Sequence, residues 1–216
     1  MSDQPAFSLR FPEVDALLAA QNMIASDKRI AFQGRVKAML RLNLLPHLTL
    51  GRGRAASYSA LDVVMLQLGL ELLQLGLSPE RAVASLIENR QIAELAIWAA
   101  RKAVQDPQSE RASYITFDPS GFDTLQDKSF LQGIPHLEGD RATSSFKALD
   151  DETISRRLTL YGMALPRVAL VNVSIVVSTL HAEVWHLRGE ADARNFAESL
   201  FSDAEERVVN AHNSQA

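Results

Sequence analysis

The sequence predicts a mainly α-helical protein whose helical N-terminal half is followed by a small α+β unit. Apolar residues recur at three- and four-residue spacing through most of residues 11–105, which is the period of helices that pack on a core. Residues 113–117 instead alternate in the manner of a strand. A chain of 216 residues exceeds the usual size of one small domain. We therefore predict one domain over residues 1–106 and a second over residues 111–210.

The composition is that of a folded globular chain, and it excludes several chemistries. Hydrophobic residues make up 47% and charged residues 22% of the sequence, both within the ordinary range. Because the chain has no cysteine, disulfides, thiolate nucleophiles, iron–sulfur clusters and cysteine-ligated zinc are excluded. The most apolar stretch, residues 168–180, is shorter than a membrane helix, and the first residues lack a secretory pattern. We expect a cytoplasmic protein without a membrane span.

The net charge of −4 conceals an uneven distribution. Residues 1–104 hold 12 Lys and Arg against 9 Asp and Glu, whereas residues 105–216 hold 10 against 17. Residues 28–61 contain no acidic residue, and a basic segment of this kind favours a polyanionic partner over a solvated basic face, the simpler alternative. The basic residues of this segment are Lys28, Arg29, Arg35, Lys37, Arg41, Arg52 and Arg54.

The first two predicted helices differ in the side chains that they display. The first spans residues 11–23 and has Pro12 in its first turn. The second begins after Asp27 and ends near Asn43, because Pro46 cannot continue a helix. Its spacing predicts an apolar inward face and a basic flank. The inward residues are Ile30, Val36, Met39, Leu40 and Leu42, and the flank carries Arg35, Lys37 and Arg41.

A short hairpin is predicted over residues 48–58. Its tip, Gly51-Arg52-Gly53-Arg54, combines glycines that allow a tight turn with two cations. A solvent loop is the simpler alternative, and a contact with phosphate or the minor groove is the functional one. Ser59 and Asp62 then match the start of a capped helix. This helix is apolar nearly all round as far as Leu75, so we expect it to be the buried centre of the domain.

Two further helices are predicted before the domain boundary. Ser78-Pro79-Glu80 has the capping residue, proline and acid of a helix start, and this helix ends near Asn89. The last helix of the first domain spans residues 90–105.

The C-terminal half combines a few short elements. After the strand over residues 113–117, residues 122–151 are rich in Gly, Pro, Asp and Ser and are predicted to be mostly loop. A helix over residues 152–161 and a buried strand over residues 167–173 follow. Ser174 is expected to cap a helix that runs to about residue 187.

The order of elements in the N-terminal half resembles the winged helix-turn-helix of the MerR family. The resemblance covers roughly residues 12–90 and rests on three fragments: Arg41-Leu42-Asn43-Leu44-Leu45-Pro46, Tyr58-Ser59-Ala60-Leu61-Asp62, and Leu73 to Glu80. In that family these fragments lie at the end of the recognition helix, at the junction of the wing with the next helix, and at the turn between the two following helices.

The resemblance implies that the second helix enters the major groove of double-stranded DNA. Gln33, Arg35 and Lys37 then reach base edges and phosphates, and Arg41 contacts the backbone. The hairpin becomes a wing whose Arg52 and Arg54 hold phosphate or the minor groove. Independently of the family, a helix with an acid-free cationic flank followed by a cationic hairpin matches two adjacent features of a duplex. The full predicted DNA-binding set is Lys28, Arg29, Gln33, Arg35, Lys37, Arg41, Arg52, Arg54 and Tyr58.

No catalytic, metal or cofactor site is predicted. His181 and His186 lie five residues apart, whereas two zinc ligands on one helix face lie four apart. The acidic residues between positions 118 and 151 match no calcium-loop spacing. Gly51-Arg52-Gly53 lacks the Lys-Ser/Thr end of a phosphate-binding loop, and no nucleophile–base pair is identifiable.

Three functions remain open at this point. The preferred one is a transcriptional regulator that binds a specific duplex site. The second is a DNA-binding adaptor of low sequence specificity whose acidic C-terminal half recruits another protein, and the third is an enzyme in that half. The expected partner is double-stranded DNA, with a homodimer and a protein partner for the C-terminal half left open.

Overall fold

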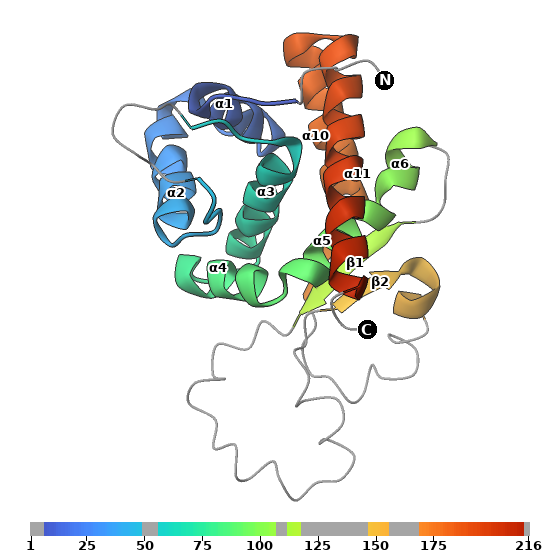
Figure 1. The fold of residues 1–216 in the computed structure, drawn as a ribbon. Helices are drawn as coiled ribbons and strands as arrows, with labels where there is room; N and C mark the ends of the chain where they lie inside the picture. Colours follow the sequence, from blue (N-terminus) through green and yellow to red (C-terminus); the bar gives the residue numbers. More distant parts are fainter. Residues whose placement is uncertain (1–6, 49–55, 107–111, 118–146, 156–168, 214–216) are drawn as a thin grey trace, which may run out of the picture.

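Helices α1 to α4 form one side of the molecule, and α5, α6, a small sheet and the last two helices form the other (Figure 1). The computed structural model describes residues 7–48, 56–106, 112–117, 147–155 and 169–213. In these residues the chain is mainly helical and has one three-stranded antiparallel sheet. The mainly α class predicted from the sequence is confirmed.

The first two helices have nearly their predicted bounds. α1 spans Phe11–Gln21, and a 3-10 turn over Ser26–Lys28 leads into α2, Arg29–Arg41. The prediction that Ile30 points inward is wrong, because its side chain is 88% exposed. The buried face of α2 instead consists of Phe32, Val36 and Met39, which are spaced four and three residues apart. Ile30 lies only two residues before Phe32 and therefore points to the opposite side of the helix.

The next two helices begin at the capping residues that the sequence indicates. α3 spans Ala60–Gln74 and α4 spans Pro79–Glu88, and the Ser78 hydroxyl accepts a hydrogen bond from the backbone N–H of Arg81. α3 is buried on nearly every side, as its continuous apolar sequence predicts, and it contacts α1, α2, α4, α10 and α11. It is the central helix around which the others are arranged.

The single helix predicted over residues 90–105 is divided in two. α5 spans Arg90–Ala99 and α6 spans Arg101–Gln105, with the break at Ala100. The backbone N–H of Ala100 lies 3.0 and 3.1 Å from the carbonyl oxygens of Ala96 and Ile97, so the last turn of α5 is tightened where the helix ends.

The sheet joins strands from three separated segments. β1 spans Ser113–Phe117, β2 spans Lys147–Asp150 and β3 spans Ala169–Asn172, in the order β2-β1-β3. Both pairings are antiparallel, and Ile115 lies opposite Ala148 on one side and Val171 on the other. β1 and β3 fall where strands were predicted, whereas β2 falls in the region predicted to be loop. The predicted helix over residues 152–161 is described only in part, since residues 151–155 are helical and residues 156–161 lie outside the described ranges.

Two long helices follow β3. α10 spans Val173–Arg188 and α11 spans Glu190–Asn213, with Gly189 at φ 92° between them. The predicted cap of α10 is wrong: the Asn172 side chain accepts the hydrogen bond from Ile175 N–H at 3.0 Å. The Ser174 hydroxyl is used elsewhere, because it accepts the backbone N–H of Ser113 at 2.9 Å and so ties α10 to β1.

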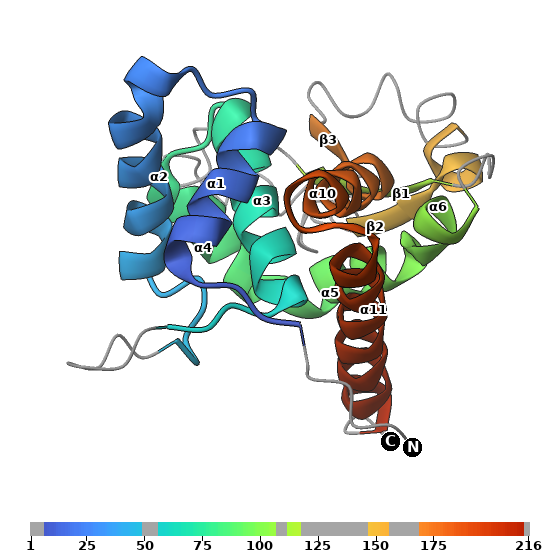
Figure 2. The ribbon, with the colours of Figure 1, turned by 90° about the horizontal axis from the view of Figure 1, so that it is seen from above.

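One apolar core runs across the boundary between the two predicted domains. α10 packs against α1, α3 and α5, and α11 packs against α3 and α5. On the surface of this contact the Gln21 amide donates a hydrogen bond of 2.6 Å to the Thr179 hydroxyl. α10 and α11 therefore pack against the N-terminal helices on the side of α3 that is away from α2 (Figure 2). The division at residues 106–111 stays a prediction.

In the part of the chain that the structure describes, the helices lack the combination of length and apolar character that crossing a membrane requires.

Candidate nucleic-acid interface

α2 lies at the edge of the molecule with one face open to solvent (Figure 2). Its buried face packs against α1, α3 and α4. The basic side chains of Arg35, Lys37 and Arg41 are exposed, and α2 itself contains no acidic residue. The three cations are therefore accessible to a polyanion, but they do not share one flank, because Lys37 follows Arg35 by two residues and so points to the opposite side of the helix.

The contact between α2 and α3 is very close at Gly69 of α3. A Cβ atom at this position would lie 2.6 Å from Met39 Sδ and 3.4 Å from Leu44 Cδ2. Met39 and Leu44 are both fully buried. The glycine thus lets α2 and the turn after it pack directly on α3, which fixes the direction in which the exposed face points.

A buried carboxylate on α1 holds the start of α2. Asp15 is 4% exposed, and its Oδ2 accepts hydrogen bonds from Arg29 Nη2 at 2.6 Å and Gln33 Nε2 at 3.0 Å. The other oxygen, Oδ1, is buried and has no hydrogen-bond partner among the described residues. Arg29 and Gln33, both predicted to bind DNA, therefore orient α2 on α1 in this structure.

Lys37 is also tied to α1. Its Nζ lies 3.3 Å from Gln33 Oε1 and 5.4 Å from the centre of the Phe11 ring. A cation over an aromatic face is attracted to it, which keeps this exposed ammonium near one edge of α2. Gln33 thus contacts the buried carboxylate of Asp15 through its Nε2 and the exposed ammonium of Lys37 through its Oε1.

Among the described residues, the contacts of Arg35 and Arg41 of α2, and of Lys28 just before it, are local. Arg35 Nη1 lies 3.4 Å from the Ala31 carbonyl oxygen, and Arg41 Nε lies 3.3 Å from the Lys37 carbonyl oxygen, both within the helix. Lys28 pairs with the exposed Asp27 at 3.0 Å. Contacts of this length between exposed groups are weak and release the side chain readily.

Tyr58 does not belong to the accessible surface. Its side chain is 1% exposed, its ring lies 6.3 Å from that of Phe11, and its backbone pairs with Leu9 in an isolated antiparallel bridge. Burial, followed by the nearby Asp62 carboxylate, raises the pKa of its phenol. The prediction that Tyr58 contacts DNA is corrected: the ring anchors the chain in the core.

Arg52 and Arg54 lie outside the described residues.

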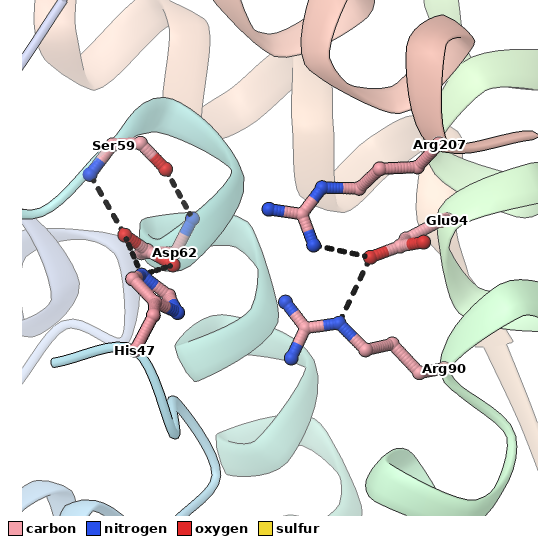
Figure 3. A network of polar contacts seen from close by, with 6 residues as sticks. All are labelled: His47, Ser59, Asp62, Arg90, Glu94 and Arg207. Carbon is pink, nitrogen blue, oxygen red and sulfur yellow. Dashed lines mark hydrogen bonds and ion pairs between the residues drawn. The ribbon is translucent and has the colours of Figure 1, made fainter. Parts of the chain in front are cut away.

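The start of α3 is capped by reciprocal hydrogen bonds between Ser59 and Asp62 (Figure 3). The Asp62 carboxylate accepts the backbone N–H of Ser59 at 2.9 Å, and the Ser59 hydroxyl accepts that of Asp62 at 3.2 Å. His47 Nε2 lies 3.0 Å from Asp62 Oδ1, so both ends of the predicted hairpin are fixed to α3. The sequence predicted the helix start at Ser59 and Asp62, whereas no sequence pattern predicted the contact of His47 with Asp62.

A second network fixes α11 to α5 (Figure 3). Glu94 Oε1 lies 2.9 Å from Arg90 Nε and 3.2 Å from Arg207 Nη1. Glu94 is buried and Arg207 is exposed, so an ion pair at the surface joins α11 to α5. α11 was not predicted from the sequence, although Ala193, Phe196, Leu200 and Ala204 recur at helical spacing and are buried.

An open cavity of about 500 Å³ lies between α11 and the start of α3. Its lining combines polar and acidic side chains with one aromatic ring: Phe7, Ser8, His47, Ser57, Ser59, Asp62, Asp203, Glu206, Arg207 and Asn210. Burial raises the pKa of Asp203, and the neighbouring Arg207 opposes this shift while Asp62 and Glu206 add to it. The lining holds three carboxylates, Asp62, Asp203 and Glu206, against the single guanidinium of Arg207, so its charge is opposite in sign to that of the exposed cations of α2.

We expect Asp15→Ala to lower the free energy of unfolding by about 2 to 3 kcal/mol, because it removes the buried partner of Arg29 and Gln33. Urea unfolding measures the loss. Asp27→Ala is the matched control, since Asp27 pairs with Lys28 in solvent and its loss should cost less than about 0.5 kcal/mol. Equal effects of the two substitutions would contradict the role given to Asp15.

Asp203→Asn is expected to raise the stability of the fold at pH 7. The folded state raises the pKa of this carboxyl, so ionisation costs stability as pH rises through the folded value, and the amide avoids that cost. Below the ordinary pKa of an aspartate, about 3.9, residue 203 is neutral in both the wild type and the variant. The gain in stability should therefore disappear there. Unfolding curves at pH 3 and pH 7 test this, and an equal gain at both pH values counts against it.

The two histidines of α10 differ in their exposure. His181 is partly buried, which lowers its pKa, and His186 is exposed. Within the described ranges, no three His, Asp or Glu side chains are placed to hold a metal ion.

Comparison of the chain with protein-family models, curated proteins and solved structures found no match.

Proposed function

We propose that the chain binds double-stranded DNA through the exposed face of α2 and acts as a sequence-specific transcriptional regulator. The observation that carries the proposal is the exposed basic surface of α2. Arg35 lies on one side of the helix, Lys37 and Arg41 lie on another, and the helix contains no acidic residue. A single α-helix fits the major groove, and cations on its sides reach the phosphates that border the groove.

The surrounding structure supports this arrangement. Asp15 binds the start of α2 and Gly69 allows α2 to pack closely on α3, and a binding helix gains affinity when its geometry is fixed in advance. The order α1, α2, predicted hairpin, α3 and α4 is that of the MerR-type winged helix-turn-helix proposed from the sequence. In that arrangement Arg52 and Arg54 form the tip of the wing.

A titration with duplex DNA tests the proposal. The full chain should bind a 30-base-pair duplex with an affinity that falls steeply with salt, by about 0.9 in the logarithmic slope for each phosphate contacted. Selection from a random duplex pool should then give one preferred sequence, bound at least about 1,000 times more tightly than scrambled duplex. Failure to bind any duplex at 50 mM salt would overturn the proposal.

The adaptor remains the second candidate because α11 is strongly acidic. Six acidic residues stand against two basic ones between Glu190 and Asn213, and Trp185 and Leu187 are exposed just before it. An adaptor is expected to bind all duplexes with similar, salt-sensitive affinity. The same selection experiment therefore separates the two candidates.

A further inference from the structure

The outermost line of α2 carries an apolar residue and a glycine beside its cations. Ile30, Gly34, Lys37 and Arg41 follow one another at intervals of four, three and four residues, so they lie along one side of the helix. This side is opposite the buried residues Phe32, Val36 and Met39. The line therefore consists of the side chains that a duplex would meet first.

Ile30 leaves nearly all of its apolar side chain in water. Its side chain is 88% exposed, and it is β-branched, which lowers its helix propensity. Covering an isoleucine side chain releases free energy because apolar surface leaves water. The apolar group that the major groove offers is the 5-methyl group of thymine.

Gly34 is not required by the protein itself. A Cβ atom at this position would meet no atom of the described residues within 4 Å, and the backbone there is ordinary helix. A glycine in the middle of a helix costs stability relative to alanine. The missing side chain thus brings no advantage within the folded chain, whereas it allows a ligand to approach the backbone of α2.

We infer that Ile30 is a specificity-determining residue that contacts a thymine methyl group, and that Gly34 lets α2 lie close to the base edges. This inference rests on the proposed binding of duplex DNA. Lys37 and Arg41 continue the same line toward the second half of the helix and hold the bordering phosphates. An acidic protein partner would also meet these cations, but it would not depend on a methyl group in the DNA.

The test uses the duplex that the full chain selects from a random pool. Each thymine of that sequence is replaced in turn by deoxyuridine, which differs only in lacking the methyl group. At one position the replacement should weaken binding by the wild-type chain by about threefold to tenfold. Ile30→Ala should bind the thymine duplex with a similar loss and show no further loss with deoxyuridine at that position.

Ile87→Ala is the matched control, because Ile87 is a partly exposed isoleucine on α4. It should retain the response to deoxyuridine. If the wild-type chain selects a sequence but responds to no methyl group, or if Ile30→Ala still responds, the inference is overturned while the proposed function stands. If no sequence is selected, the proposed function fails and this inference fails with it.

Gly34→Ala tests the close approach separately. The variant should unfold at the same or a higher urea concentration than the wild type, since the new methyl group has open space and alanine favours the helix. Its affinity for the selected duplex should nevertheless fall about tenfold, by the cost of a steric clash at the interface. An unchanged affinity overturns the role given to Gly34.

Discussion

Replacing Lys37 and Arg41 together with glutamine is expected to weaken duplex binding by about 10- to 100-fold at 0.15 M salt. Both side chains are exposed and lie on the side of α2 that faces away from the core. Losing two phosphate contacts should also make the dependence of log affinity on log salt shallower by about 2. Fluorescence anisotropy with a labelled duplex, repeated at several salt concentrations, measures both effects.

The matched control removes the same charges elsewhere. Lys102 on α6 and Arg194 on α11 are exposed, and α6 lies on the opposite side of the molecule from α2 (Figure 2). The double glutamine variant at these positions should change affinity by less than about twofold, because long-range effects of exposed charges are screened. Equal losses in the two double variants would mean that net charge, and not α2, governs binding.

Gly69→Val is expected to cost about 3 kcal/mol of stability, because the new side chain would occupy the space of Met39. Urea unfolding provides the measurement. Gly34→Val is the matched control, since it makes the same change on the exposed side of α2 and should stay within about 0.5 kcal/mol of the wild type.

A double variant shows whether the cost arises at the contact with Met39. Met39→Ala alone should destabilise the fold by about 2 to 5 kcal/mol through the cavity that it leaves. Combined with Gly69→Val, the valine fills part of that cavity, so the double variant should lose less than the sum of the single losses. Additive losses would contradict the close packing of α2 on α3.

Local signals predicted helix starts well. Ser59 with Asp62, and Ser78 before Pro79, mark helix starts because the groups that satisfy the first backbone N–H donors lie within a few residues of them. The basic, acid-free character of α2 was likewise visible from composition alone. These features depend on neighbours in the sequence, which a single chain displays directly.

Features that depend on distant residues were missed. The hydrogen bond between Gln21 and Thr179 joins residues more than 150 positions apart in the sequence, and no local sequence pattern predicts it. The same holds for Asp15, whose burial follows from its contact with Arg29 and Gln33 on the next helix. Ile30 was placed inward because apolar residues are usually buried, and only the packing of Phe32 fixes which side of α2 is exposed.

Because the chain has no cysteine, a single thiol can be placed on α2 without other changes, and this gives the most direct test of the account. Ala31→Cys lies on the exposed side of α2, and Ala99→Cys is at an exposed position at the end of α5, a helix on the other side of the molecule from α2 (Figure 1). Each variant is labelled with an iron chelate that cleaves nearby DNA. Cleavage of the selected duplex at one defined position from Ala31→Cys, and none from Ala99→Cys, is the predicted result. Cleavage from Ala99→Cys alone, with intact binding by both proteins, would contradict the central claim.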